Sequence, residues 1–133
     1  MSLVKLLPAW LHAIADYAVG ILLIVVALAN DGSDGAKATG VVVGAVVLLV
    51  SMATRYPLGV FKVLPFTIHS AGDYLAAALL IAAPFVLNFA DAEGGIAAFY
   101  VVMGVAVLAV SLVTNYQYSP KRQENAQPRT VTA

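Results

Sequence analysis

Four long apolar runs dominate the sequence, and short polar segments separate them. The runs cover residues 8–29, 39–54, 67–90 and 95–113. A helix needs about 20 mostly apolar residues to cross a bilayer, and isolated strands would leave backbone groups without partners in lipid. The second run is the shortest, so we expect its helix to extend into residues 36–38. The pattern therefore predicts four transmembrane helices.

The second pair of runs repeats the first. A Leu-Pro pair, a histidine, an aspartate and a tyrosine recur 57 positions further along the chain. The matching polar residues are His12, Asp16 and Tyr17 in the first copy, and His69, Asp73 and Tyr74 in the second. The ends of the second helices match 60 positions apart, as Tyr56 and Tyr116 do. Apolar matches are common by chance in membrane helices, but coincident polar residues are not, so one helical hairpin is used twice.

Each copy holds two spans, so both copies enter the membrane from the same side. The copies are then related by an axis along the membrane normal, as in proteins with parallel repeats. The sequence predicts an all-α integral membrane four-helix bundle, made of two transmembrane hairpins with this pseudo-twofold axis. Residues 1–62 are expected to form the first hairpin repeat, residues 63–116 the second, and residues 117–133 a flexible cytoplasmic tail.

The basic residues indicate how the chain is oriented. Six of them fall at the termini and in the central loop, namely Lys5, Arg55, Lys62, Lys121, Arg122 and Arg129. The two hairpin tips, residues 30–38 and 91–94, hold four acidic residues against one lysine. Cytoplasmic loops carry an excess of lysine and arginine. Both termini and the central loop, residues 55–66, are therefore predicted to be cytoplasmic.

Composition narrows the classes of function. Charged residues make up 11% of the chain and hydrophobic residues 62%, whereas a soluble domain has about 25% charged residues. We therefore expect the protein to lie in a lipid bilayer. Its expected protein partner is a second copy of the chain, giving a homo-oligomer, or another membrane protein. The formal net charge is zero, which argues against a nucleic-acid partner. The sequence has no cysteine and no standard enzyme motif, so we expect no thiolate metal site, no catalytic residue and no enzyme.

The repeated His-x-x-x-Asp-Tyr motif is the candidate functional feature. Residues four apart lie on one helix face, so His12 lies over Asp16 and His69 over Asp73. Asp16 follows Pro8 by eight residues, which is roughly 12 Å along a helix. At that depth a carboxylate costs on the order of 2.5–3.5 kcal/mol. It must therefore face the bundle interior, pair with another group or take up a proton, and the pseudo-twofold axis lets the two motifs approach one another.

The leading interpretation is a non-enzymatic accessory or self-associating scaffold module that holds no cofactor and no metal. In it, each aspartate accepts hydrogen bonds from its own histidine, from a tyrosine, or from hydroxyl groups near the end of a second helix. These hydroxyl groups belong to Ser51, Thr54, Ser111 and Thr114. The resulting clusters, which pack the helices together, are His12 with Asp16 and Tyr17, and His69 with Asp73 and Tyr74.

Two other interpretations stay open. In one, His12 and His69 ligate a haem or a metal ion, and the aspartates are further ligands or orient the histidines. In the other, Asp16 and Asp73 carry protons or small solutes across the membrane. Four short helices leave little room for a pore, so transport would require an oligomer.

Three glycines indicate where helices come close. Gly40 and Gly44 form a G-x-x-x-G pattern, which permits close helix contact, and Gly104 holds the position of Gly44 in the second copy. We expect helix contacts at these three positions.

The chain resembles the SPW-repeat family of small bacterial membrane proteins. The likeness is carried by His69-x-x-x-Asp73-Tyr74 and the apolar segment 79–89 that follows, and it extends over most of residues 6–116. The Ser-Pro-Trp signature of that family is replaced by Ala83-Pro84-Phe85 in the second copy and by Val26-Ala27-Leu28 in the first. The resemblance implies paired helices in a bacterial inner membrane, and it implies no particular activity.

Overall fold

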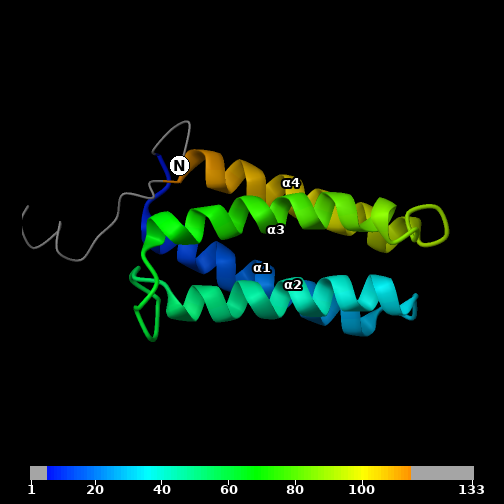
Figure 1. Cartoon of the computed structure of the whole chain (residues 1–133), viewed down its shortest axis with the longest axis horizontal. Helices are drawn as coiled ribbons and strands as arrows, with labels where there is room; N and C mark the ends of the chain where they lie inside the picture. The colour runs from blue at the N-terminus through cyan, green and yellow to red at the C-terminus, as the bar shows by residue number, and fades with distance from the viewer. Residues whose placement is uncertain (1–5, 115–133) are drawn as a thin grey trace, which may run out of the picture.

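The computed structural model describes residues 6–114, which form two helical hairpins lying side by side (Figure 1). The helices are α1 (Ala9–Ala29), α2 (Asp34–Ala53), α3 (Phe66–Val86) and α4 (Gly94–Val113). Each is long and apolar enough to cross a membrane, and α1 packs on α2 as α3 packs on α4. The all-α four-helix bundle predicted from the sequence is confirmed. The predicted tail, residues 117–133, lies outside the described residues.

Both hairpin tips lie at one end of the bundle, which we call the tip end. The central loop, predicted over residues 55–66, covers residues 54–65 in the structure and lies at the other end, which we call the loop end (Figure 1). At the loop end the Leu7 amide donates to the Val113 carbonyl at 2.8 Å, and the Leu64 amide donates to the Ala53 carbonyl at 2.7 Å. These are the same contact made twice, because both donors and both acceptors are matching positions of the repeat. The start of each repeat thus pairs with the end of the other.

Within each hairpin the two helices approach closely at glycines. A Cβ atom on Gly44 would lie 2.7 Å from the Gly20 carbonyl oxygen of α1, and one on Gly104 would lie 2.9 Å from the Ala77 carbonyl oxygen of α3. Gly40 faces the backbone of α1 in the same way. Because backbone faces these positions, only glycine fits without moving a helix. The three predicted glycines therefore lie at contacts inside the hairpins.

The contacts between the hairpins differ at the two ends. Toward the tip end, apolar side chains from all four helices form a buried core that includes Leu23, Val43, Leu80 and Tyr100. Toward the loop end, the buried side chains of α1 and α3 are mainly polar. Both helices are fully described, and no Cα atom of α1 comes within 8 Å of a Cα atom of α3. Side chains alone therefore span the gap between them.

Polar contacts also join the two tips. The Ser33 hydroxyl caps α2 by accepting a hydrogen bond from the Ala36 amide at 3.3 Å, which explains why α2 begins at Asp34, before the expected residues 36–38. The Ser33 hydroxyl and amide both donate to the Glu93 carboxylate, the amide at 2.7 Å. These bonds hold the pKa of Glu93 below its ordinary value.

Helix α3 ends earlier than the apolar run predicts, at Val86 instead of residue 90. Asn88 adopts a left-handed conformation with a φ of 57°, which asparagine tolerates better than most residues. The Phe89 amide then donates to the Pro84 carbonyl at 3.0 Å, as in a Schellman helix end. The chain therefore turns back into the tip although its sequence stays apolar.

The outer surface of the bundle is apolar along all four helices. Only 33% of each candidate span is buried, and large exposed side chains include Ile21, Leu49, Leu75 and Val102. Soluble monomers rarely expose apolar surface on this scale, whereas lipid covers it at no cost. The fold is therefore that of a multi-pass membrane protein.

Two alanine substitutions test the close helix contact. Gly44→Ala should destabilise the protein by about 1–3 kcal/mol, because the added methyl group would force α1 and α2 apart. Gly72→Ala is the control, since a Cβ atom there meets nothing within 4 Å and alanine favours a helix interior by about 0.8–1 kcal/mol over glycine. Reversible unfolding in detergent would measure both. Equal stability of the two variants would contradict the packing described.

Candidate functional site

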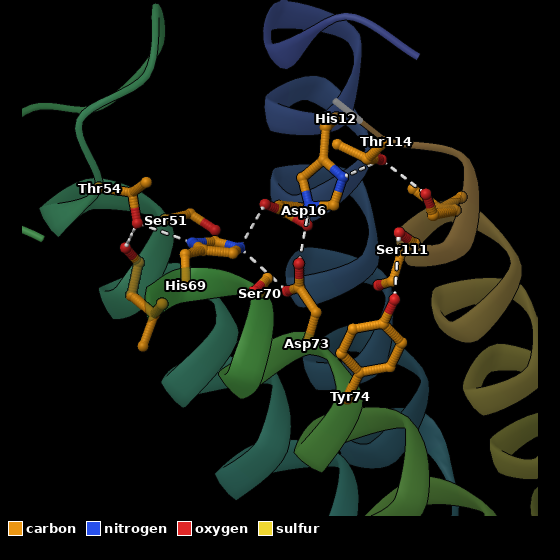
Figure 2. A network of polar contacts seen from close by, with 12 residues as sticks. His12, Asp16, Ser51, Thr54, His69, Ser70, Asp73, Tyr74, Ser111 and Thr114 are labelled. Atoms are coloured by element: carbon orange, nitrogen blue, oxygen red, sulfur yellow. Dashed lines mark hydrogen bonds and ion pairs between the residues drawn. The ribbon is translucent and has the colours of Figure 1, made fainter. Parts of the chain in front are cut away.

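The histidines and aspartates of the repeated motif meet between α1 and α3 (Figure 2). His12 and Asp16 project from α1, and His69 and Asp73 project from α3. All four are buried, with 1%, 8%, 2% and 7% of their surface exposed, respectively. We call these four residues the quartet. The spacing of four puts each pair on one helix face, and the twofold relation turns both faces inward.

Each histidine of the quartet contacts both aspartates through its Nε2 atom. His12 Nε2 lies 3.2 Å from one oxygen of Asp16 and 2.9 Å from one of Asp73. His69 Nε2 lies 3.1 Å from the other oxygen of Asp16 and 2.9 Å from the other oxygen of Asp73. The four side chains therefore form a closed ring. Two of its contacts lie within a helix, and two join the repeats.

A threonine fixes the other nitrogen of each histidine. The His69 Nδ1 atom lies 2.7 Å from the Thr54 hydroxyl oxygen, and that hydroxyl donates to the Val50 carbonyl at 2.6 Å. A hydroxyl has one hydrogen to donate, so it accepts its second hydrogen bond from Nδ1–H. His12 has the same arrangement with Thr114. Both histidines thus carry a hydrogen on Nδ1 and present Nε2 to the aspartates.

The charges of the quartet can balance within it. If Nε2 also carries a hydrogen, each ring is a cation, and two imidazolium groups balance two carboxylates. This matters because an unpaired charge is costly to bury. The four contacts are short, but none has the alignment of a hydrogen bond from Nε2.

Aromatic residues at both ends of the central loop close the site. The Tyr56 hydroxyl donates to Asp16 at 3.1 Å, and its side chain is fully buried. Burial and the neighbouring Asp16 carboxylate raise the pKa of Tyr56, so the phenol keeps its proton and stays a donor. The rings of Tyr56 and Phe66 pack on His69, with centroids 5.5 and 5.6 Å away.

Two residues of the predicted clusters, Tyr17 and Tyr74, have hydroxyl groups that point away from the quartet. The Tyr17 hydroxyl donates to the Leu58 carbonyl in the central loop at 2.8 Å. The Tyr74 ring is turned toward α4, where its hydroxyl lies 3.5 Å from the Ser111 carbonyl (Figure 2). Each tyrosine directly follows its aspartate, so it is turned about 100° around the helix from it. That rotation takes both hydroxyls away from the face that carries the quartet.

The hydroxyl partners of the quartet also differ from the expectation. Thr54 and Thr114, expected to donate to the aspartates, accept from the histidines. Tyr56 takes the role expected of Tyr17, and its match Tyr116 lies outside the described residues. The signal for these residues was their recurrence 60 positions apart. The sequence could not indicate that each threonine reaches the first helix of the other repeat.

The site does not fit a haem. Two histidines that ligate one haem hold its iron, and therefore the macrocycle, between their nitrogens. Here carboxylate oxygens lie within 3.2 Å of both Nε2 atoms. The space that a macrocycle would need is filled by Asp16 and Asp73.

The two differently placed tyrosines give a direct test of the site. Tyr56→Phe should lower the free energy of unfolding by about 1.5–3 kcal/mol, because a buried hydrogen bond to a carboxylate is lost. Tyr17→Phe should change it by less than about 0.5 kcal/mol, because its hydroxyl bonds an exposed carbonyl. Unfolding in detergent measures both. A larger loss for Tyr17→Phe than for Tyr56→Phe would contradict the arrangement.

The chain was compared with protein-family models, curated proteins and solved structures. No protein-family model matches it. No curated protein matches it, and no solved structure does.

Proposed function

We propose that the protein is a non-enzymatic membrane module, acting as an accessory or scaffold subunit, in which the quartet locks two hairpins into one bundle. One observation carries this proposal. The backbones of α1 and α3 stay apart, and the buried side chains of the quartet join them. The threonine contacts to His12 and His69 add two more links between the hairpins.

Lipid makes such a lock effective. Apolar helix faces gain little by leaving lipid for one another, so close packing and polar contacts drive helix association in membranes. The quartet supplies polar contacts at the loop end, and Tyr100 supplies another nearer the tips by donating to the Ala36 carbonyl. A wrongly docked hairpin would leave its carboxylates in lipid, and each would cost on the order of 2.5–3.5 kcal/mol. The quartet therefore favours one arrangement of the hairpins.

The placement of the polar atoms supports a role without turnover. Each Nδ1 atom faces a threonine, and each Nε2 atom faces two carboxylate oxygens. A catalytic group needs an atom directed at a space for substrate. The cavity beside the quartet, between α1 and α4, measures about 50 Å³, whereas sites for small molecules measure about 300–1,000 Å³.

The proposal includes a place for the module in the cell. Arg55 and Lys62 in the central loop, against the acidic tips, favour a cytoplasmic loop end. The resemblance to SPW-repeat proteins favours a bacterial inner membrane. The apolar outer faces of the helices suit lipid or the helices of a partner, and the predicted G-x-x-x-G glycines are already used inside the hairpins.

Removing one carboxylate tests the lock. Asp73→Asn, studied in detergent with a chelator present, should lower the free energy of unfolding by about 3 kcal/mol, because both histidines lose a charged partner in a buried site. Tyr17→Phe is the control, because its hydroxyl bonds an exposed carbonyl of the central loop, and it should unfold close to the unaltered protein. An Asp73→Asn variant as stable as Tyr17→Phe would refute the lock.

The orientation is testable with single cysteines, because the chain has none of its own. Val60→Cys places a thiol in the central loop, and Ala92→Cys places one in a tip. In intact bacterial cells, a membrane-impermeant maleimide should label Ala92→Cys at once and Val60→Cys only after permeabilisation. The opposite order of labelling would show that the tips, not the central loop, are cytoplasmic.

A further inference from the structure

We infer that the quartet is a binding site for one divalent transition-metal ion, with Zn²⁺ as the ion its donors fit best. This inference deepens the proposed function, and it rests on the same arrangement of His12, Asp16, His69 and Asp73. The four can each offer one ligand atom, and these atoms all lie within 4.8 Å of one another.

The donor set selects the class of ion. Two imidazole nitrogens with two carboxylate oxygens suit Zn²⁺ and its transition-metal neighbours. Calcium and magnesium ions prefer oxygen ligands throughout, in larger number. Four protein ligands also complete the tetrahedral shell of zinc, as in structural zinc sites that lack an open position. A closed shell agrees with a module that performs no turnover.

The distances allow one ion to be held by all four residues. Zinc lies about 2.0–2.2 Å from nitrogen and oxygen ligands, so neighbouring ligand atoms in a tetrahedron lie about 3.3 Å apart. The four contacts between Nε2 atoms and carboxylate oxygens, each to a different oxygen, are 3.2, 2.9, 3.1 and 2.9 Å long. One ligand atom from each residue can be chosen so that all four lie within 4.8 Å of one another. Rotation of the carboxylates and small shifts of the rings would place these four atoms around one ion.

The surroundings of the histidines match those of metal ligands. Histidines that bind metals almost always donate their other N–H to a fixed acceptor, which sets the tautomer and the ring orientation. The Thr54 hydroxyl accepts this hydrogen bond from His69, and the Thr114 hydroxyl accepts it from His12, at 2.7 Å in both cases. The hydroxyls are themselves held by carbonyls of their own helices. Nε2 is thereby left as the coordinating atom on both rings.

The charge of the site selects a divalent ion. With neutral histidines, Asp16 and Asp73 give the quartet a charge of −2, and one divalent cation cancels it. A monovalent or trivalent ion would leave a net charge within the bundle, which is costly to bury.

A small cavity reaches the quartet. It lies between α1 and α4, measures about 50 Å³, and is lined by His12, Asp16 and Ser111 and otherwise by alanines and valines of the two helices. One water molecule needs roughly 10–15 Å³, so water fits beside the quartet. The fully buried Ser111 hydroxyl lines this cavity and has no hydrogen-bond partner within the described residues. A water molecule or an entering aquo ion would supply one.

The test uses the full chain in detergent, without a polyhistidine tag and stripped with a chelator that is then removed. Co²⁺ should bind as one ion per chain and give the intense visible absorption of tetrahedral cobalt. Zn²⁺ should displace it and bleach the colour, and calorimetry should give the same stoichiometry for zinc alone. Absence of saturable binding at one ion per chain would overturn the inference.

Three variants assign the binding to the quartet. Asp73→Asn should abolish the cobalt spectrum, and Tyr17→Phe, whose hydroxyl lies on the central loop, should leave it unchanged. Thr54→Val keeps all four ligands and should weaken zinc binding about 10–100-fold, because His69 loses its orienting partner. This variant keeps the test decisive even if Asp73→Asn folds poorly. Unchanged zinc affinity in a folded Thr54→Val or Asp73→Asn variant would place the ion elsewhere and overturn the inference.

The test separates this inference from the proposed lock. Failure of the unaltered protein to bind zinc, with Asp73→Asn still destabilised in the presence of chelator, refutes only the metal site. Zinc binding by the unaltered protein, with no destabilisation of chelated Asp73→Asn, supports the metal site and refutes the lock.

Discussion

Two carboxylates buried between membrane helices are the constraint on which the bundle depends. Asp16 and Asp73 lie on helices long and apolar enough to cross a membrane, and their side chains are buried between those helices, where an unmatched charge is costly. Each is matched by both histidines, one on its own helix and one on the other repeat, so each hairpin adds to the polar contacts of the other. In the proposed lock, this mutual pairing favours one docking of the two hairpins, with these helix faces together.

The rest of the fold accommodates this pairing. The swapped backbone contacts of Leu7 and Leu64 bring the ends of α2 and α4 next to the histidines of the other repeat, which is why a threonine can fix each ring. Glycines let the helices of each hairpin pack tightly, while α1 and α3 stay far enough apart for four side chains to fit between them. The polar core at the loop end and the apolar core at the tip end thus divide the bundle. The first specifies the arrangement, and the second fills the remaining volume.

The sequence predicted the helices, the duplication and the burial of the histidines and aspartates, because each leaves a pattern of length or spacing. It did not predict which tyrosine reaches the site. Tyr17 is adjacent to Asp16 in the chain but lies on another helix face, whereas Tyr56 is distant in the chain and is brought back by the central loop. Contacts within one helix follow from its period. Contacts made by the loop and by helix ends depend on how the hairpins dock, and the spacing of residues along the sequence does not predict that docking.

The contact between His12 and Asp73 carries the central claim, because it joins the two repeats at 2.9 Å. A double-mutant cycle of His12→Ala and Asp73→Ala, measured by reversible unfolding with a chelator present, tests it most directly. We expect a coupling energy of about 1 kcal/mol or more, since residues that share a buried polar network are not independent. Additive effects of the two substitutions would show that the repeats are not joined through these side chains, and would contradict the account.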